Sequence, residues 1–142
     1  MGNSEKQLTE NEEKKEYLKS YQRAVRREQE ILDEIQRLRA DKMFPSVVGD
    51  GMPRGNGQSD LSEYAAILDD QIQALKEERL EKVKAYENIE KRVRQMKNDD
   101  EQRVLRLRYI RGMKWEEVAV AMGHSWQHVH RIHAKALKNF NM

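Results

Sequence analysis

The chain has 142 residues, of which 37% are charged and 6% aromatic, with two prolines and no cysteine. This composition favours long solvated helices over a large globular core, and the lack of cysteine excludes a disulfide framework and a thiolate zinc site. The net charge of +2 is uneven: Lys and Arg number eleven against twelve acids in residues 1–60, eight against eight in 61–98, and eight against five in 99–142. A positive C-terminal part suits a nucleic-acid partner.

The N-terminal third of the chain predicts one long helix. Residues 1–13 are polar and offer Leu8 for burial, so we expect them to fray or stay disordered. From about residue 12 to 42, apolar residues recur with a heptad-like spacing. They are Leu18, Tyr21, Val25, Leu32 and Ile35. A stripe this narrow cannot form a core alone, so the helix needs a partner helix.

Residues 43–60 interrupt the helical pattern. They hold both prolines and four of the seven glycines, which predicts a loop because proline lacks a donor and glycine favours turns. Within it, Pro53-Arg54-Gly55 could place Arg54 in a narrow minor groove. A plain connecting loop is the commoner reading of so short a motif.

A second long helix follows. Ser59-Asp60 with Glu63 has the pattern of a capping box. The apolar seam that begins at Leu61 is regular up to Leu75 and slips near Leu80, so it is not a perfect coiled coil. The two helices most simply pair as an antiparallel hairpin over residues 1–98, which can also pair with a second copy. We therefore expect a homo-oligomer.

Residues 99–142 read as a separate helical domain. Polar residues 98–100 supply caps for a helix from about Glu101 to Arg111. Its four arginines, at positions 103, 106, 108 and 111, could touch phosphates, and an ion-paired or solvated arginine is as good a reading of each. About 42 residues bury little surface, so this domain should need the helical half or a dimer partner for stability.

The stretch from Gly112 to Phe140 predicts a helix-turn-helix. A short helix from about Lys114 to Ala121 is followed by a turn at residues 122–124, where Gly123 can take a positive φ. Ser125 then caps a helix that runs to about Phe140. The first helix offers Trp115, Val118, Ala119 and Met122 to a common core, and the second offers Trp126, Val129, Ile132, Ala136, Leu137 and Phe140. The fold class is therefore all-α, a helical hairpin followed by a helix-turn-helix.

The outer face of the last helix is polar and basic. Residues lie about 100° apart around a helix axis, which places six of them outward: Gln127, His128, Arg131, Ala134, Lys135 and Lys138. From Ser125 onward there are three basic residues and no acid, as a phosphate backbone requires. Gln127 can bond an adenine edge and Arg131 a guanine edge, while small Ala134 permits a close approach. A solvated basic face is the plain alternative, but the turn, the cap and the missing acids together favour DNA readout.

These residues resemble a known family. Residues 129–138, with Trp115-Glu116-Glu117-Val118-Ala119 and Leu107-Arg108-Tyr109-Ile110 before them, are similar to region 4 of bacterial sigma-70 factors, most closely from Asp99 to Phe140. The whole chain resembles small phage-encoded regulators of the ArpU and RinA type. In sigma region 4 the second helix of the motif reads promoter DNA. The resemblance implies base or backbone contacts from Ser125, Trp126, Gln127, His128, His130, Arg131 and Lys135, and the basic face adds Lys138.

The sequence departs from sigma factors in two ways. Trp126, His128 and His130 stand where sigma factors tend to carry other polar or charged residues, so the DNA sequence that is read should differ from an ordinary promoter element. No part resembles sigma region 2, so promoter melting is not expected of this chain alone. The angular count also places Trp126 on the core side, which leaves it the weakest of the carried-over contacts.

Metal binding and catalysis find little support in the sequence. His124 and His128 have the i, i+4 spacing of a zinc pair, but no Cys or carboxylate joins them, and His133 falls on the apolar face, where a hydrogen-bonded packing role fits better. No nucleophile has a neighbouring base and no glycine-rich loop precedes a helix. We expect neither an enzyme nor a cofactor.

The sequence thus predicts a sequence-specific regulator of transcription that binds double-stranded DNA, acts on phage genes, forms oligomers and can contact the host RNA polymerase. The alternative is a structural or DNA-packaging subunit of a phage, and a module that binds only protein is a third reading. The charged N-terminus is not a signal peptide and no apolar run could span a membrane, so we expect a cytoplasmic protein without a membrane partner.

Overall fold

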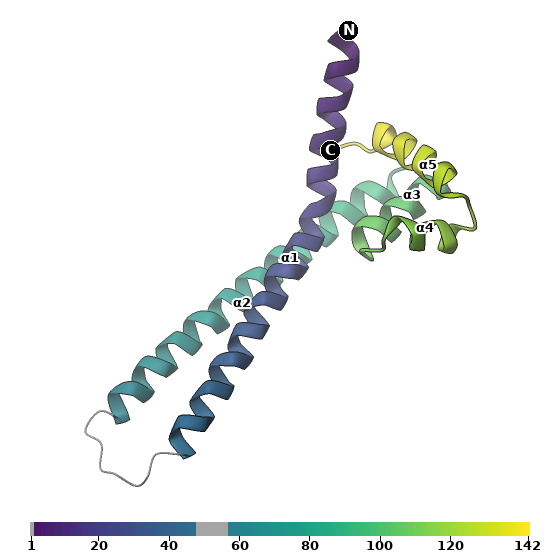
Figure 1. Ribbon diagram of the computed structural model, residues 1–142. Coiled ribbons are helices and arrows are strands. Elements are labelled where there is room, and N and C mark those ends of the chain that lie inside the picture. Colours follow the sequence, from purple (N-terminus) through teal and green to yellow (C-terminus); the bar gives the residue numbers. More distant parts are fainter. Residues whose placement is uncertain (1, 48–56) are drawn as a thin grey trace. The chain divides into compact units, whose positions relative to one another are not determined.

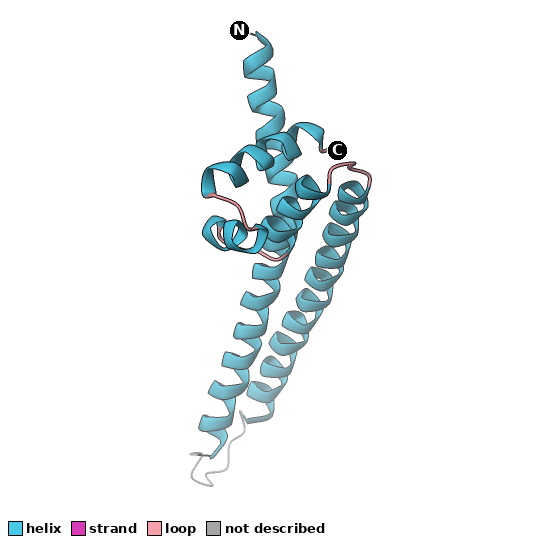
Figure 2. Cartoon of the chain, turned by 90° about the vertical axis from the view of Figure 1, so that its right-hand side faces the viewer, coloured by secondary structure: helices cyan, strands magenta, loops and turns pink. Residues whose placement is uncertain are grey.

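The computed structural model describes residues 2–47 and 57–142, with side chains described in 2–41 and 61–142. Within these residues the fold is all-helical, as predicted (Figures 1 and 2). The elements, in order, are α1 (Gly2–Val47), α2 (Gly57–Arg94), α3 (Asp99–Leu105), the π-helical η1 (Arg106–Ile110), α4 (Trp115–Met122) and α5 (Trp126–Asn139). They form two compact units, unit 1 (Met1–Arg23 with Lys82–Met142) and unit 2 (Ala24–Glu81).

Helix α1 is longer than the sequence indicated. It begins at Gly2, so the expectation that residues 1–13 fray is wrong for 2–13. Straight-chain Glu, Lys and Gln lose little side-chain freedom in a helix and dominate this segment. Thr9 also donates its hydroxyl to the Glu5 carbonyl oxygen at 2.9 Å. Leu8, the one residue offered for burial, remains exposed.

The predicted loop 43–60 is shorter in the structure. Helix α1 ends at Val47 and α2 begins at Gly57, so both enter the predicted loop and the expected cap at Ser59-Asp60 falls inside α2. A long helix that is already nucleated extends at low cost, which lets it pass through a few unfavourable residues. Residues 48–56, including Pro53-Arg54-Gly55, lie outside the described residues.

Unit 2 is an antiparallel pair of helices formed by parts of α1 and α2, as the sequence predicted (Figure 1). Ile35 and Leu75 are buried, whereas Leu61, Ile67 and Leu80 stay exposed. Charged pairs cross between the two helices: Arg27 Nε lies 2.8 Å from Glu78 Oε1, and Arg79 Nε lies 3.4 Å from Glu28 Oε2. Few apolar side chains are therefore buried between the two helices.

Unit 1 has a continuous core to which every element contributes. Leu18 of α1 and Ile89 and Val93 of α2 are fully buried in it. They join residues of the C-terminal helices, among them Val104, Leu105, Val118, Val129, Leu137 and Phe140. We expected the domain of residues 99–142 to need residues 1–98 or a second copy for its stability. Within unit 1, α1 and α2 supply part of its core.

Polar contacts also join α1 to the C-terminal helices within unit 1. Lys14 donates its Nζ to the Leu137 carbonyl oxygen at 2.7 Å, near the C-terminal end of α5. Gln22 donates its Nε2 to the Ile110 carbonyl oxygen, also at 2.7 Å. Lysine near a helix C-terminus satisfies carbonyl groups that lack a helical partner. The first half of α1 is thus packed and hydrogen-bonded against the helix-turn-helix.

Candidate nucleic-acid interface

Helix α3 begins at Asp99, two residues before the predicted start at about Glu101, and one of the polar residues expected to cap it, Asn98, is its N-cap. The Asn98 side chain accepts a hydrogen bond from the Glu101 backbone N–H at 2.9 Å. The helix continues into the π-helical turn η1, in which the Arg111 N–H donates to the Arg106 carbonyl oxygen five residues earlier. Such turns insert one extra residue into a helix. The sequence predicted a helix over this stretch but not its π character.

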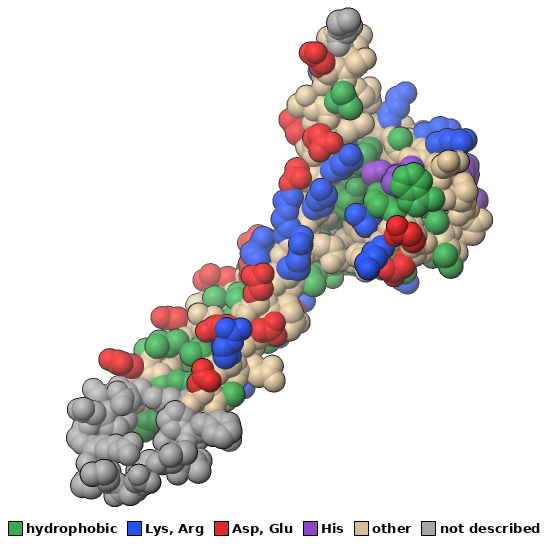
Figure 3. All heavy atoms as spheres, in the orientation of Figure 1, with side chains coloured by type: hydrophobic (Ala, Val, Ile, Leu, Met, Phe, Trp, Pro, Cys, Tyr) green, Lys and Arg blue, Asp and Glu red, His purple; other side chains and the backbone are tan. Residues whose placement is uncertain are grey.

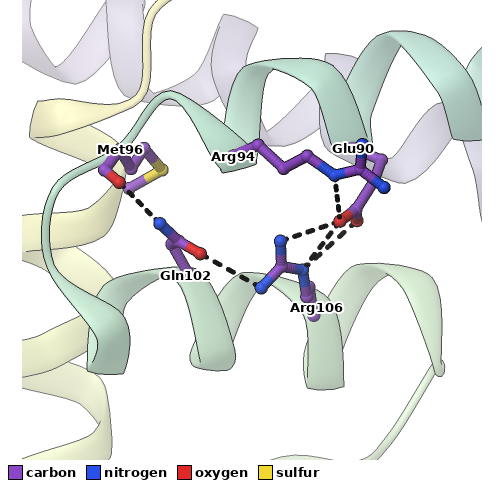
Figure 4. A network of polar contacts seen from close by, with 5 residues as sticks. All are labelled: Glu90, Arg94, Met96, Gln102 and Arg106. Carbon is purple, nitrogen blue, oxygen red and sulfur yellow. Dashed lines mark hydrogen bonds and ion pairs between the residues drawn. The ribbon is translucent and has the colours of Figure 1, made fainter.

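One of the four arginines is held in an internal network (Figure 4). The Arg106 guanidinium contacts the Glu90 carboxylate, with Nη2 to Oε1 at 2.7 Å, and its Nη1 donates to Gln102 Oε1 at 3.1 Å. Gln102 in turn donates to the Met96 carbonyl oxygen. The ion-paired reading therefore holds for Arg106, and this side chain is already engaged by a carboxylate.

The other three arginines differ in their surroundings. Arg103 donates its Nη2 to the Ala121 carbonyl oxygen at 2.8 Å. Arg108 donates its Nη1 to the Met113 carbonyl oxygen, and its guanidinium carbon lies 4.7 Å from the centre of the Trp115 ring. Arg111 is exposed. Arg108 lies close to α5, because its partner Trp115 contacts His130 and His133 of that helix.

The turn between α4 and α5 has the geometry that the sequence predicted. Gly123 takes φ +68° and ψ +31°, in the left-handed region. The N–H groups of Gly123 and His124 donate to the carbonyl oxygens of Val120 and Ala119, which is the Schellman arrangement at a helix end. Ser125 Oγ then accepts the His128 N–H at 3.1 Å and caps α5. Two helices joined by such a turn form a helix-turn-helix.

The two faces of α5 divide as predicted, with one exception. Val129, Ile132, Ala136, Leu137 and Phe140 are buried. All six residues expected on the outer face are exposed: Gln127, His128, Arg131, Ala134, Lys135 and Lys138. Trp126 was placed on the core side, but 52% of its surface is exposed. It is the first helical residue, where the helix no longer lies over the core.

An aromatic series borders the outer face. The Trp126 ring centre lies 3.9 Å from that of His130, and the His130 ring centre lies 4.5 Å from that of half-buried Trp115. The rings are tilted against one another, by 51° and 43° respectively, and present a large apolar surface. His130 is thus held between two tryptophans, at the edge of α5 rather than at the centre of its outer face.

His133 has the packing role that its position suggested. Its Nε2 lies 2.7 Å from the Tyr109 hydroxyl, and both side chains are buried. Burial, reinforced by the positive charges of Lys15, His130 and Arg108, lowers the pKa of His133 to about 4. Burial also raises the pKa of Tyr109 to about 12. Both side chains are therefore neutral near pH 7.

The remaining histidines lie at the start of α5. The ring centres of His124 and His128 are 4.6 Å apart. Within residues 2–41 and 61–142, no group of three or more His, Cys, Asp or Glu side chains is arranged to hold a metal ion.

No helix in the described part of the chain has the length and apolar character needed to cross a membrane.

The turn, the cap and the exposed basic face of α5 define a helix-turn-helix of the DNA-binding class. Residues 98–139 match the family model of sigma-70, region 4, so this segment is similar to the DNA-binding helix-turn-helix of that family. The match covers nearly the same residues in which the sequence showed its closest resemblance. Searches of curated proteins and of solved structures gave no significant match.

Proposed function

We propose that this protein is a sequence-specific regulator of transcription that binds double-stranded DNA with α5 in the major groove. One observation carries the proposal: α5 exposes Gln127, Arg131, Lys135 and Lys138 on one face, with no acid from Ser125 onward, inside a segment that matches sigma-70 region 4. A basic helix face free of carboxylates suits the phosphate backbone, and its polar side chains suit base edges.

Each exposed residue takes a role that its chemistry allows. Arg131 reads guanine and Gln127 reads adenine, because each can make two hydrogen bonds to one base edge. Lys135 and Lys138 contact phosphates, and so fix the position of the helix without selecting a sequence. Ser125, Trp126, His128 and His130 border the N-terminal half of α5 and contact the DNA there. The exposure of Trp126 supports its place in this set.

We further propose that the protein regulates phage genes, that it acts as a dimer or higher oligomer through the helices of residues 1–98, and that it contacts the host RNA polymerase. The phage setting and the polymerase contact rest on the family resemblance. Oligomerisation is supported by Leu61, Ile67 and Leu80, which unit 2 leaves exposed. Two helix-turn-helix motifs at a fixed spacing would bind a symmetric operator more tightly than one.

The first test is selection of bound duplexes from a random DNA library by the full-length protein at about physiological salt. We expect one enriched motif, with two-fold symmetry if two copies act together. An Arg131→Glu variant, which changes a single exposed side chain, should lose the enrichment. Absence of any motif with the wild-type protein would contradict the proposal and favour a packaging role or a module that binds only protein.

Alanine variants then separate base readout from backbone contact. Arg131→Ala should weaken specific binding by about 1–3 kcal/mol and relax selection at one position, because a bidentate contact to guanine is lost. Lys138→Ala should weaken all duplexes alike and lower the slope of log affinity against log salt by about one. Titrations of the selected and an unrelated duplex measure both. An unchanged motif and affinity for Arg131→Ala would remove Arg131 from the readout.

A further inference from the structure

A cavity of about 240 Å³ lies beside α5 within unit 1. Lys15 and Lys19 of α1, Arg108 of η1, and Trp115 and His130 line it, together with Tyr109 and His133, and none of its lining residues is an acid. Figure 3 shows basic side chains of α1 on the same face as the histidines of the helix-turn-helix. Positively charged side chains from segments that are far apart in the sequence therefore lie around one cavity.

The two lysines that line the cavity form only weak ion pairs within α1. Lys15 lies 3.2 Å from Glu12, and Lys19 lies 3.8 Å from Glu16, each three residues away on α1. Exposed pairs of this kind contribute little to stability, so a phosphate in the cavity can compete for either ammonium group. Lys14, the neighbour of Lys15, holds α1 beside α5 through its bond to the Leu137 carbonyl oxygen.

His130 has an unused hydrogen-bonding atom at the same place. Its Nε2 is buried and has no hydrogen-bond partner among the residues that the structure describes. A buried polar atom without a partner destabilises the fold, because it has lost its hydrogen bonds to water. Because this atom has almost no accessible surface, a phosphate oxygen in the cavity would accept a hydrogen bond from it only after the ring turned toward the cavity. The cavity thus offers positive charge as it stands and a directional donor once the His130 ring turns.

We propose that this cavity binds a phosphate group of the duplex backbone, so that α1 extends the DNA interface beyond the helix-turn-helix. The inference rests on the proposed DNA binding by α5. A helix about 10–12 Å across nearly fills a major groove about 12 Å wide, so residues at its edges meet the flanking backbone. His130 stands at such an edge, one turn from Gln127 and Ala134 of the exposed face. The cavity is also smaller than pockets for drug-sized molecules, which span about 300–1,000 Å³.

The experiment measures affinity for the selected and an unrelated duplex over a series of salt concentrations. The full-length protein is compared with the double variant Lys15→Gln/Lys19→Gln. The matched control, Lys91→Gln/Lys97→Gln, removes the same charge from exposed lysines of unit 1 that do not line the cavity. We expect the cavity variant to bind both duplexes on the order of tenfold more weakly, with a salt slope lower by about one to two and an unchanged motif. The control should stay close to wild type.

A second variant, His130→Phe, keeps a ring between the two tryptophans and removes Nε2. It should weaken both duplexes by less than the lysine variant does. Unchanged affinity and salt slope for Lys15→Gln/Lys19→Gln, while the wild type still selects a motif, would overturn this inference and leave the proposed function intact. Failure of the wild type to bind any duplex would overturn both.

Inorganic phosphate distinguishes a second source of the same group. If it shifts the His130 ring signals in NMR spectra, and the lysine variant abolishes this shift without any loss of duplex binding, then the cavity takes free phosphate and the assignment to DNA is wrong. Loss of affinity for the selected motif alone would likewise exclude a backbone contact, because phosphates are common to all sequences.

Discussion

The two compact units of the chain are stabilised in different ways. Unit 1 surrounds a continuous apolar core, whereas the described side chains of unit 2 bury only Ala24, Ile35 and Leu75 and rely on charged pairs between the helices. Burial of apolar surface contributes about 25 cal/mol per Å², while an exposed ion pair contributes about 0–1 kcal/mol. Stability should therefore be concentrated in unit 1, and unit 2 keeps apolar surface available for a partner.

Removal of core volume from each unit tests this difference most strongly. Leu18→Ala should lower the free energy of unfolding by about 3–5 kcal/mol, because Leu18 is completely buried in the continuous core of unit 1. Ile35→Ala should cost less, because two helices alone enclose it and can close around the gap. Denaturant unfolding gives both values. Equal losses would show that the two units are packed alike.

Protonation of His133 should weaken unit 1 and not unit 2. The pKa of His133 is about 4 in the folded protein and 6.5 without its surroundings, so the unfolded chain binds the proton more readily. The stability that His133 confers is complete above pH 6.5 and is lost as the pH falls toward 4, by about 3 kcal/mol at most. All four histidines lie in residues 124–133, which confines the effect to unit 1.

Denaturant titrations at several pH values between 7 and 4, compared with His133→Gln, measure this loss. Carboxylates titrate over the lower part of the same range, and the variant corrects for them because it retains every acid. Hydrogen exchange read residue by residue locates the effect. An identical pH dependence in the variant would exclude His133 as its source.

Alanine substitutions at the two glycines with positive φ test how closely α1 packs in unit 1. Gly112 and Gly123 both have φ +68°, so alanine at either should cost about 1–2 kcal/mol from backbone strain. A Cβ at Gly123 would meet nothing within 4 Å, whereas one at Gly112 would lie 3.0 Å from Gln22 Oε1. Gly112→Ala should therefore lower the melting temperature further. A larger effect at Gly123 would mean that Gln22 yields easily.

The smallest expected effect is the loss of stability when one carboxylate in each unit is replaced by an amide. Glu90 binds Arg106 and Arg94 and its side chain is 13% exposed, so Glu90→Gln should cost about 1–2 kcal/mol. Glu78 is similarly buried at 16% exposed, but the arginine that it binds, Arg27, is half exposed, so Glu78→Gln should cost less than about 1 kcal/mol. Thermal unfolding in low and high salt measures both. A greater loss at Glu78 would reverse the ranking of the two units.

Local patterns were enough to predict the helix-turn-helix and the face of α5. Gly123, Ser125 and the spacing of the apolar residues act over a few positions, so their consequences can be read from the sequence. The same holds for His133, because its place on the apolar face predicted that it would be packed and hydrogen-bonded. The rule failed at Trp126, because periodicity gives the side of the helix on which a residue lies but not how far along the helix the core extends.

Contacts between distant segments could not be predicted in this way. No short-range pattern shows that Leu18 enters the core of the helix-turn-helix or that Lys15 and Lys19 lie beside His130. Helical periodicity gives the face that a residue occupies but not the element that covers it. The π-helical turn at Arg106–Ile110 was also missed, since its residues are ordinary helix formers. The extent of α1 was underestimated because polarity was taken as a sign of disorder.

The hydrogen bond from Lys14 to Leu137 has a consequence for the order of events during synthesis. It joins residues that are 123 positions apart. At about 5–20 residues per second, the carbonyl partner of Lys14 is made roughly 6–25 seconds after Lys14 itself. Leu18 must likewise wait for Phe140 to complete the core that they share. Unit 1 can close only when nearly the whole chain exists, so a prematurely terminated copy would expose an unfinished apolar core.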